Sequence, residues 1–448
     1  MLQNKKHHVV IIGGGFGGLY AAKALRRVPV RVTLIDRRNF HLFQPLLYQV
    51  ATGIICPGEI ASPIRHILRR QKNTRVLLGE VTDIDPDNKT VTLADGEINY
   101  DTLIVATGME NYYYGNDAWR KHAPGLKTIE DGAKIRQKIF FAFEVAEREG
   151  DPEVRRDWLT FVIVGSSPTG VELSGMVSEI ARKTLREDFR SIRPEESRII
   201  LVDLATSILP SYPSDLSRKA KASLERLGVT IRTGVRVQSI DDCSVTIDEA
   251  SGREQIGART ILWAAGVRAS PLGRKLAEKT GVHLDDSGRV MVNPDLTLHR
   301  YPNIFVIGDL ACVPGGDGRP LPGVAPVATQ QGRFVSRIVR ARLSGHTTPP
   351  TFRYFDKGTL AVIGRNVAVA DIGKLHFSGT LAWLLWIFIH LMLLVKFENR
   401  VVVFIRWAFQ YFTVNRGSRQ LRAEGLLKLP LTSCAIDRED SPSFSSNH

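Results

Sequence analysis

The chain has 448 residues, 43% of them hydrophobic and 24% charged, and its formal net charge is +14. This length favours two or three domains, and the composition excludes a disordered protein. The charge favours a polyanionic partner, either nucleic acid or the anionic face of a membrane, over a merely soluble basic enzyme.

Cysteine usage and the N-terminus both indicate an intracellular protein. Cys56, Cys243, Cys312 and Cys434 lie far apart and form no C-x-x-C pair. A disulfide framework and a metal site are therefore not expected. A Gly-rich turn begins by residue 13, which leaves no room for a signal peptide. We expect the catalytic body to stay in the cytoplasm.

The first motif is G-x-G-x-x-G at Gly13, Gly15 and Gly18, between an apolar run and a helix-forming segment. A second apolar run then ends in Asp36. Gly13 permits the tight turn, Gly15 lets the backbone approach a pyrophosphate, and Gly18 allows close helix–strand packing. The helix N-terminus stabilises phosphate charge, and Asp36 accepts hydrogen bonds from a ribose. This spacing predicts a dinucleotide site.

The pattern returns later with one change. An apolar strand at 159–164 precedes G-S-S-P-T-G, which keeps Gly165 and Gly170 but has Ser167 at the second glycine position. A further strand ends in Asp203. We interpret this copy as a functional NADH site of modestly altered affinity, in which the Ser167 hydroxyl donates to a phosphate. Asp203, with no arginine in the following L-A-T-S, favours NADH over NADPH.

Matching segments close the two copies. They are Y-D-T-L-I-V-A-T-G at 100–108 and A-R-T-I-L-W-A-A-G at 258–266. The strand in Y-P-N-I-F-V-I-G-D-L-A (301–311) ends in Gly308-Asp309 and follows the second copy, so we expect it to return to the first. The fold class is therefore α/β, with two nested Rossmann-like domains and a C-terminal membrane-attachment region of amphipathic or apolar helices.

The expected boundaries follow this order. They are 1–115 (first dinucleotide-binding domain, first part), 116–155 (connecting helical segment), 156–275 (second dinucleotide-binding domain), 276–345 (first domain, return part), 346–378 (strand-rich connection), 379–425 (membrane-attachment helices) and 426–448 (disordered tail, polar and Ser-rich over its last dozen residues).

These residues together resemble the two-dinucleotide-binding-domain flavoproteins, and within that group the type II NADH dehydrogenases of bacterial membranes. The likeness is carried by N-F-H-L-F-Q-P-L-L-Y-Q-V-A-T-G (39–53), I-A-S-P-I-R (60–65), G-V-A-P-V-A-T-Q-Q-G (323–332) and L-A-W-L-L-W-I-F-I-H (381–390). The resemblance implies that NADH reduces FAD by hydride transfer and that the flavin then reduces a quinone, without proton pumping.

The resemblance also implies site residues. FAD is expected at Gly13, Gly15, Phe16, Gly17, Gly18, Asp36, Arg37, Gln44, Pro45, Leu46, Val81, Ala106, Thr107, Gly108, Gly308, Asp309 and Ala328. NADH is expected at Gly165, Ser167, Thr169, Gly170, Asp203, Ala265 and Gly266. Glu172 is the expected proton-delivery group, Gln330 and Gln331 face the quinone, and Lys396 reaches its pocket. Without the resemblance, Glu172 could equally be an acidic residue that stabilises a helix N-terminus, and the two glutamines could be helix caps.

Four alternatives compete with this interpretation. Disulfide reductases need a C-x-x-x-x-C after the first fingerprint, where only Cys56 stands. Sulfide-oxidising quinone reductases need paired cysteines beside the flavin, which the scattered four do not suit. A soluble-acceptor reductase conflicts with the apolar C-terminal region, and a degenerate FAD-binding sensor or scaffold is motivated only by Ser166-Ser167.

The C-terminal region predicts membrane attachment. Residues 381–395 contain one strongly polar side chain, His390, and as a helix they would measure roughly 22 Å, short of the ~30 Å hydrocarbon core. We favour two helices lying in one leaflet over a spanning helix or a lipid-free dimer interface. Interfacial aromatic and basic side chains support this: Trp383, Trp386, Trp407, Tyr411, Lys396, Arg400, Arg406, Arg416, Arg419 and Arg422.

The expected partners are a membrane quinone, an anionic lipid surface and a second copy of the chain. Lys and Arg are spread through the sequence without a recognised nucleic-acid-binding motif, so nucleic acid is not expected. The expected location is the cytoplasmic face of the inner (plasma) membrane.

Overall fold

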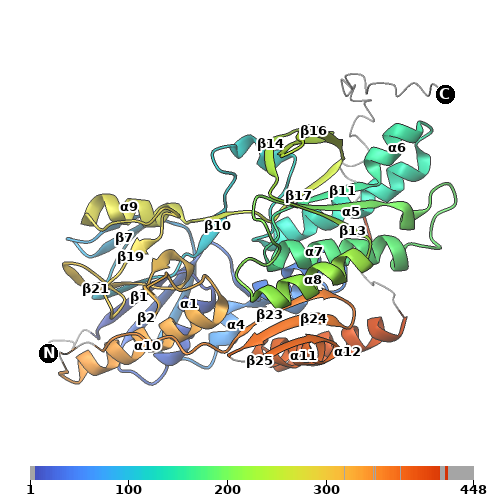
Figure 1. Cartoon of the computed structure of the whole chain (residues 1–448). Helices are drawn as coiled ribbons and strands as arrows, with labels where there is room; N and C mark the ends of the chain where they lie inside the picture. The colour runs from blue at the N-terminus through green and yellow to red at the C-terminus, as the bar shows by residue number, and fades with distance from the viewer. Residues whose placement is uncertain are drawn as a thin grey trace, which may run out of the picture.

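A computed structural model describes residues 6–316, 318–346, 348, 350–373, 375–413 and 419–421. Two α/β units lie side by side, joined by a narrow connection, and a C-terminal layer of strands and helices packs beneath the second unit (Figure 1). The nested α/β fold expected from the sequence is confirmed. The expected tail at 426–448 and the last part of the attachment region lie outside the described residues.

The first unit is built on a six-stranded sheet of order β20-β21-β9-β1-β2-β5. Five of these strands are parallel and β20 is antiparallel. The strands are β1 (His8–Ile12), β2 (Arg31–Asp36), β5 (Thr74–Leu78), β9 (Thr102–Val105), β20 (Thr297–Leu298) and β21 (Tyr301–Val306). β21 follows the whole second unit in the chain yet pairs with β9, as the nested arrangement requires.

Helices α1 (Phe16–Ala24) and α10 (Ala325–Leu343) pack against each other beside this sheet (Figure 1). A Cβ on Gly332 of α10 would lie 2.3 Å from the carbonyl oxygen of Gly17, so glycine is required for this close approach. Smaller elements complete the unit: β3 (Phe40–Leu42), α2 (Leu47–Ala51), α3 (Pro57–Ile60), β4 (Ala61–Pro63), α4 (Ile64–Leu68), β6 (Val81–Asp85), β7 (Thr90–Leu93), β8 (Gly96–Asn99), β19 (Val290–Met291) and β22 (Ala311–Cys312).

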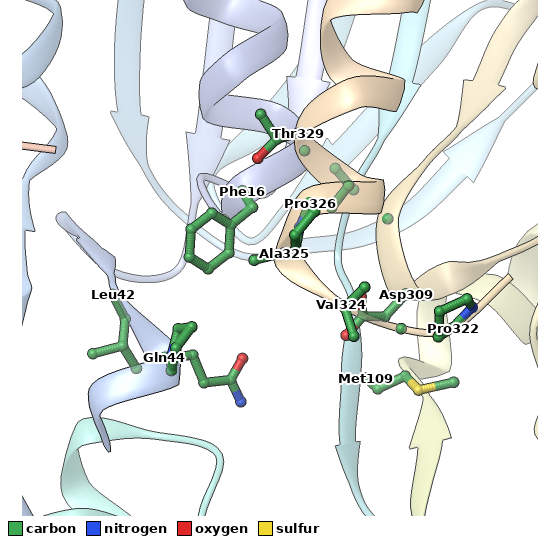
Figure 2. A pocket seen from close by; sticks show the side chains of 18 of the residues that line it. Phe16, Leu42, Gln44, Met109, Asp309, Pro322, Val324, Ala325, Pro326 and Thr329 are labelled. Carbon is green, nitrogen blue, oxygen red and sulfur yellow. The ribbon is translucent and has the colours of Figure 1, made fainter. Parts of the chain in front are cut away.

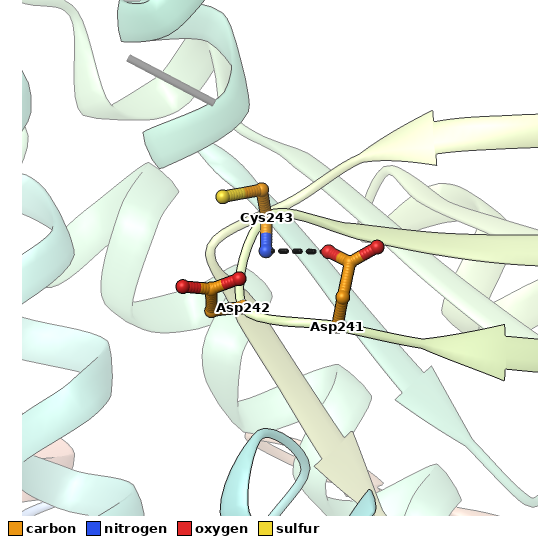
Figure 3. Close-up of side chains that lie close together, drawn as sticks. All are labelled: Asp241, Asp242 and Cys243. Atoms are coloured by element: carbon orange, nitrogen blue, oxygen red, sulfur yellow. Dashed lines mark hydrogen bonds between the residues drawn. The ribbon is translucent and has the colours of Figure 1, made fainter. Parts of the chain in front are cut away.

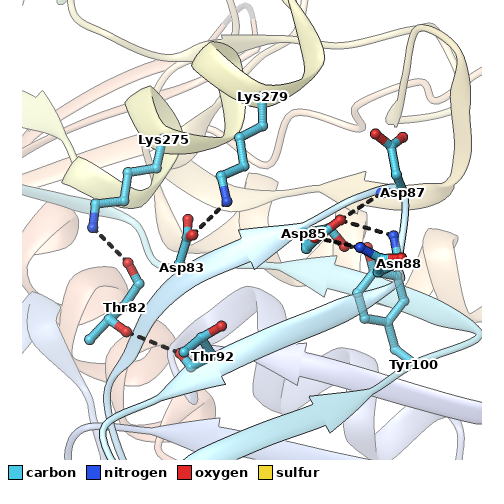
Figure 4. A network of polar contacts seen from close by, with 9 residues as sticks. All are labelled: Thr82, Asp83, Asp85, Asp87, Asn88, Thr92, Tyr100, Lys275 and Lys279. Carbon is cyan, nitrogen blue, oxygen red and sulfur yellow. Dashed lines mark hydrogen bonds and ion pairs between the residues drawn. The ribbon is translucent and has the colours of Figure 1, made fainter.

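Helix α9 (Pro271–Thr280) fastens the returning chain to the β6–β7–β8 meander (Figure 4). Lys275 Nζ donates to the Thr82 carbonyl at 2.7 Å, and Lys279 Nζ pairs with Asp83 at 2.5 Å. These contacts join residues almost 200 positions apart. The meander is therefore held by a helix that the sequence places beyond the second unit.

The second unit has the four-stranded parallel sheet β13-β12-β11-β17 and an antiparallel meander. A two-stranded pair, β10 with β18, carries the chain out of the first unit and back. The elements are β10 (Met109–Asn111), α5 (Ile129–Arg148), α6 (Pro152–Trp158), β11 (Thr160–Val164), α7 (Pro168–Glu179), β12 (Arg198–Asp203), α8 (Ser214–Arg226), β13 (Val229–Thr233), β14 (Arg236–Ile240), β15 (Ser244–Glu249), β16 (Gly252–Gly257), β17 (Thr260–Trp263) and β18 (Val267–Ala269).

The C-terminal layer is an antiparallel sheet followed by two helices (Figure 1). It contains β23 (Thr359–Gly364), β24 (Val367–Ile372), β25 (Leu375–Gly379), α11 (Thr380–Leu393) and α12 (Phe397–Thr413). α7 crosses β23 so closely that a Cβ on Gly175 would lie 1.7 Å from the Ile363 carbonyl oxygen. The layer is thus part of the core of the second unit.

Helices α11 and α12 have 14 and 17 residues. Within the part of the chain that the structure describes, neither they nor any other helix combines the length and apolar character needed to cross a membrane.

Candidate active site

One cavity of about 1860 Å³ runs from the first Gly-rich turn, past α7, to α11. It receives side chains from both α/β units and from the C-terminal layer. In Figure 2, Phe16 of α1 lies beside Ala325 and Pro326 at the start of α10, and Leu42 and Gln44 face them. A cavity of this size exceeds the usual volume of a small-ligand site and can hold a large cofactor together with a substrate.

The first Gly-rich turn forms a cradle. Gly13 has φ +101°, and a Cβ on Gly18 would lie 1.9 Å from the Gly13 carbonyl oxygen, so both positions require glycine. Gly15 is the N-cap of α1, and a Cβ there would meet nothing within 4 Å. The open space at Gly15 lies where a pyrophosphate would sit at the helix N-terminus, so these residues fit FAD.

Asp36 ends β2 beside this cradle. Its Oδ2 accepts the Gly14 N–H at 2.5 Å, and its Oδ1 accepts the Arg38 N–H at 2.7 Å. Burial raises the pKa of Asp36, and the two backbone hydrogen bonds oppose that rise. The carboxylate is therefore fixed by the backbone, with lone pairs left for ribose hydroxyls.

Most of the expected FAD residues line this cavity. They are Gly13, Gly15, Phe16, Gly17, Asp36, Arg37, Gln44, Pro45, Val81, Ala106, Thr107, Gly108, Gly308, Asp309 and Ala328. Gly18 and Leu46 do not line it: Gly18 packs against Gly13, and Leu46 is fully buried in the core.

Lys127 and Asp309 both line this cavity, and their charges influence each other. Burial raises the pKa of Asp309, and the charges of Lys127 and Arg289 oppose this. Burial likewise lowers the pKa of Lys127, and Asp309 counteracts it. Sequence reasoning missed Lys127 because it lies outside every motif, in the segment before α5.

The second Gly-rich turn repeats the first. Gly165 has φ +103°, and a Cβ on Gly170 would lie 1.7 Å from the Gly165 carbonyl oxygen. Ser167 is the N-cap of α7 with φ −63°, close to the −68° of Gly15. Serine therefore imposes no backbone strain here. Its hydroxyl donates weakly to the Ala264 carbonyl at 3.4 Å.

The expected NADH residues are only partly in the cavity. Thr169 lines it, whereas Gly165, Ser167, Gly170, Asp203, Ala265 and Gly266 do not. Asp203 ends β12 and accepts the N–H groups of Ser166 and Ala205, as Asp36 does in the first unit. The expected role of these residues in binding NADH stays a prediction.

Glu172 lies on α7 and points into the cavity, although it is 8% exposed. Its Oε1 accepts the Val362 N–H at 3.5 Å, and burial raises its pKa well above the usual value. Glu172 is in the second helical turn, so the helix dipole contributes little. Tyr212 also lines the cavity, and burial together with the Glu172 charge raises its pKa.

The two glutamines of α10 are both engaged with the backbone. Gln330 lines the cavity, but its amide donates to the Phe355 carbonyl at 2.9 Å and accepts the Phe355 N–H at 3.0 Å. Gln331 is 1% exposed, does not line the cavity, and accepts the Gly308 N–H at 2.6 Å. Lys396 also lies outside the cavity lining. Their expected roles at the quinone stay predictions.

Helix α11 closes one end of the cavity with Phe388, Ile389, His390, Met392 and Leu393. His390 Nδ1 contacts the Trp386 carbonyl at 2.8 Å, and burial lowers the pKa of His390 to about 4. The imidazole is therefore neutral near pH 7, with Nε2 as its acceptor. The sequence had marked His390 only as the polar residue of an apolar segment.

Aromatic rings connect the cradle to the C-terminal helices. Phe16 meets Phe43 edge-on at 5.7 Å, and Phe43 meets His390 at 6.4 Å. His390 stacks on Trp386 at 4.1 Å, and Trp386 packs against Trp407 of α12 at 5.3 Å. This packing holds α11 against the cavity.

A small polar cluster lies away from the cavity (Figure 3). Asp241, Asp242 and Cys243 bring two carboxylates and a sulfur within 4.8 Å of one another. Cys243 is disulfide-bonded, which the spacing of the cysteines did not lead us to expect, so its sulfur is not free to bind a metal. Asp241 accepts the N–H groups of Cys243 and Ser244 at 2.8 and 2.7 Å, so it caps the turn between β14 and β15. The local hydrogen bonds account for this arrangement.

Comparisons with known proteins agree with this geometry. Residues 7–332 match the pyridine nucleotide-disulphide oxidoreductase family model, and residues 357–414 match the NDH2 C-terminal domain. The type II NADH:quinone oxidoreductases NdhA and Ndh of Mycobacterium tuberculosis are each 46% identical to the chain. These matches cover 94% and 92% of this chain and 90% of each relative.

The chain belongs to the type II NADH:quinone oxidoreductase family. It is accordingly an FAD-dependent oxidoreductase. A Staphylococcus aureus family member is 29% identical over 85% of this chain and 92% of its own length. The sensor or scaffold alternative is not supported by these matches.

Solved structures share the fold. NDH2 from Plasmodium falciparum, in complex with NADH, has a TM-score of 0.84 at 21% identity and covers 91% of this chain and 99% of its own. The sulfide:quinone oxidoreductase of Aquifex aeolicus has a TM-score of 0.72 at 18% identity and covers 91% and 95%. Among the described residues, no cysteine lines the cavity.

Proposed function

We propose that this enzyme oxidises NADH and reduces a membrane quinone while attached to the membrane surface, without pumping protons. The observation that carries the proposal is the cavity, which joins the FAD cradle to Glu172 and to the apolar side chains of α11. When bound, FAD accepts the hydride of NADH and supplies two electrons to the quinone. The residues of the chain bind and orient the cofactor and the substrates, and they supply protons.

The FAD-binding groups are divided along the cavity. The N–H groups at Gly15 and the start of α1 receive the pyrophosphate, and Asp36 accepts hydrogen bonds from the adenosine ribose. Asp309, on which the charge of Lys127 acts, would accept hydrogen bonds from the hydroxyl-bearing chain of the cofactor. Phe16 and Pro326 line the cavity on the α1–α10 side and would contact the bound cofactor there (Figure 2).

NADH binds on the second Gly-rich turn and reaches the cavity past Pro168 and Thr169. Asp203 accepts hydrogen bonds from the ribose, and no basic side chain follows it in Leu204–Ile208. A carboxylate at this position repels a 2′-phosphate, so we propose NADH rather than NADPH as the donor.

The quinone enters from α11. Phe388, Met392 and Leu393 give that end of the cavity an apolar surface, and they are 63%, 48% and 44% exposed. Neutral His390 adds a hydrogen-bonding group there. Glu172, whose burial raises its pKa, holds a proton to higher pH than an ordinary carboxyl and delivers it as the quinone is reduced.

The membrane surface is formed by the outer faces of α11 and α12. Large exposed apolar side chains concentrate there, namely Leu381, Leu384, Phe388, Met392, Leu393, Phe397, Val401, Val402, Phe404, Ile405, Phe409, Tyr411 and Phe412. Such a contiguous apolar surface favours an interfacial site. We place this face on the cytoplasmic side of the membrane.

The basic residues near this surface are not equally free. Arg406 pairs with Glu59, and Arg419 pairs with Asp188. Arg400 donates to the Leu394 carbonyl at 2.9 Å. Arg416 and Arg422 lie outside the described residues. We propose that the apolar face supplies most of the free energy of membrane binding and that anionic lipid adds less. We also propose that the chain forms a homodimer, which light scattering tests.

Two half-reactions on detergent-purified holoenzyme test the function. Anaerobic NADH is expected to bleach the flavin absorbance rapidly, and a soluble quinone analogue, but not ferredoxin, is expected to restore it. Absence of bleaching, or restoration by ferredoxin alone, would overturn the proposal. Proteoliposomes containing a pH-sensitive dye check the pumping: turnover without internal pH change supports the proposal.

A further inference from the structure

An exposed tyrosine stands on the nucleotide surface of the second unit. Tyr114 follows β10 and is 60% exposed, yet its ring lies against Gly266. A Cβ on Gly266 would be 2.8 Å from Tyr114 Cε2, Cζ and Oη. Only a glycine at 266 therefore leaves room for the ring.

Tyr114 is held there by an unusual backbone and by aromatic neighbours. Its φ is +51°, a conformation that a bulky residue adopts only when surrounding contacts enforce it. Its ring packs on Tyr112 at 4.8 Å and approaches Trp263 edge-on at 6.4 Å. Gly115, with φ +88°, follows directly.

Hydrogen bonds anchor the segment that precedes Tyr114. The β10–β18 pair places Asn111 opposite Val267, and the Tyr112 N–H donates to the Gly266 carbonyl at 3.3 Å. Trp263 Nε1 donates to the Tyr112 carbonyl at 2.9 Å. The ordered backbone, together with the side chains of Tyr112 and Trp263, thus holds the exposed Tyr114 ring in place.

The location of the ring identifies its ligand. Gly266 follows β17 on one side of the second Gly-rich turn, and Asp203 ends β12 on the other. Burial raises the pKa of Tyr114, and the charge of Asp203 adds to the rise, so the phenol lies near that carboxylate. A dinucleotide bound across this turn would pass beneath the Tyr114 ring.

We propose that Tyr114 is an aromatic lid on the nicotinamide-dinucleotide groove and a determinant of NADH affinity. The ring moves aside at Gly115, admits the dinucleotide over Gly266, and covers it from solvent. The ring supplies apolar contact area at low entropic cost, and the hydroxyl can donate to a ribose or phosphate oxygen. The inference rests on the proposed NADH oxidation and adds a residue that lies outside both Gly-rich motifs.

Titration of holoenzyme with NAD⁺ by calorimetry, together with stopped-flow flavin reduction by NADH, tests the lid. Tyr114→Ala is expected to raise both the NAD⁺ dissociation constant and the NADH concentration for half-maximal reduction about tenfold, a typical effect of losing a stacked aromatic contact. The limiting reduction rate, FAD content and quinone KM should stay within about twofold of the original protein. Tyr114→Phe separates the ring from the hydroxyl: retained affinity assigns the effect to the ring, and partial loss assigns a share to the hydroxyl.

Tyr301→Ala is the matched control, since Tyr301 lies in the first unit, bonds Asp87 at 2.9 Å and does not line the cavity. It should leave nucleotide affinity unchanged. Unchanged affinity in Tyr114→Ala, or equal loss in both variants, would overturn the lid while leaving NADH oxidation intact. Failure of NADH to bleach the original protein would instead overturn the proposed function.

Discussion

The Ser166 hydroxyl donates to Oδ2 of Asp203 at 2.7 Å, and the Ser166 N–H donates to the same oxygen. In the first unit, Gly14 makes only the backbone contact to Asp36. Ser166, which stands where the first unit has Gly14, thus adds a side-chain donor to the carboxylate that ends β12. The Ser166-Ser167 pair motivated the degenerate alternative, yet one of these serines helps to hold the Asp203 carboxylate in place.

Ser166→Ala is expected to raise the NADH KM roughly three- to tenfold with little change in kcat, because one hydrogen bond to the Asp203 carboxylate is lost while two backbone donors remain. Steady-state kinetics with saturating quinone measures this. Ser174→Ala removes another buried hydroxyl of the same region, one that donates to the Gly170 carbonyl at 2.7 Å, and should leave the KM unchanged. Equal KM values for all three proteins would contradict the assigned role.

Ser167→Gly tests the residue at the second glycine position. Ser167 has an unstrained φ and only a weak hydroxyl contact to Ala264, so the substitution should change the NADH dissociation constant modestly, about two- to threefold, through any phosphate contact of the hydroxyl. Calorimetric titration measures the change. If affinity and turnover both stay the same, Ser167 does not tune the site.

Glu172→Gln separates the two half-reactions. Flavin reduction by NADH should continue at a similar rate, whereas reoxidation by quinone should slow about a hundredfold, because the proton donor is lost. Burial raises the pKa of Glu172, so the original protein should lose quinone reactivity as pH rises through that pKa, and the variant should lack this alkaline limb.

Glu179→Gln provides the control, since Glu179 is also buried on α7 but pairs with Lys183 at 3.7 Å and accepts the Arg365 N–H. The rate of flavin reoxidation by quinone in Glu179→Gln should still fall at alkaline pH, as in the original protein. A Glu172→Gln protein with normal reoxidation would place the proton donor elsewhere.

His390→Gln should flatten the acid side of the stability profile. Burial lowers the pKa of His390 to about 4, below its usual 6.5, so the folded state binds fewer protons than the unfolded state between these values. The free energy of unfolding therefore falls as pH decreases from 6.5 towards 4, by about 2 kcal/mol at pH 5 from this group.

Urea unfolding of the holoenzyme at pH 7.5 and pH 5 measures the effect, and glutamine can keep the hydrogen bond to the Trp386 carbonyl. The exposed residue His299 supplies the control His299→Gln, which should retain the original slope. An unchanged slope in His390→Gln would show that this histidine is not buried in neutral form.

Membrane attachment should depend on the exposed face of α12. Replacing Phe404, Phe409 and Phe412 by serine is expected to lower binding to phospholipid vesicles at least tenfold, because each ring loses apolar contact with lipid. Co-sedimentation with neutral and anionic vesicles measures binding and separates apolar from electrostatic attachment. Serine at Met291, Leu343 and Phe355, exposed apolar residues on other elements, should have no effect.

The sequence by itself determined the two nucleotide units and their nesting. Gly13, Gly18, Gly165 and Gly170 are required by backbone angles or close approaches that are local in the chain, and a carboxylate at the end of the next strand follows from the same local geometry. The apolar C-terminal helices could also be predicted from the sequence, because helix length and side-chain character are local properties.

Tertiary structure decided what the individual polar groups do. Gln331 bonds Gly308 rather than lining the cavity, Arg406 pairs with Glu59, and the charge of Lys127 acts on Asp309. Each partner comes from a different part of the chain, so no local pattern predicts it. Tyr114 lies against Gly266 for the same reason: the β10–β18 pair brings together residues that are about 150 positions apart, and only this pairing gives the exposed ring a place above the nucleotide groove.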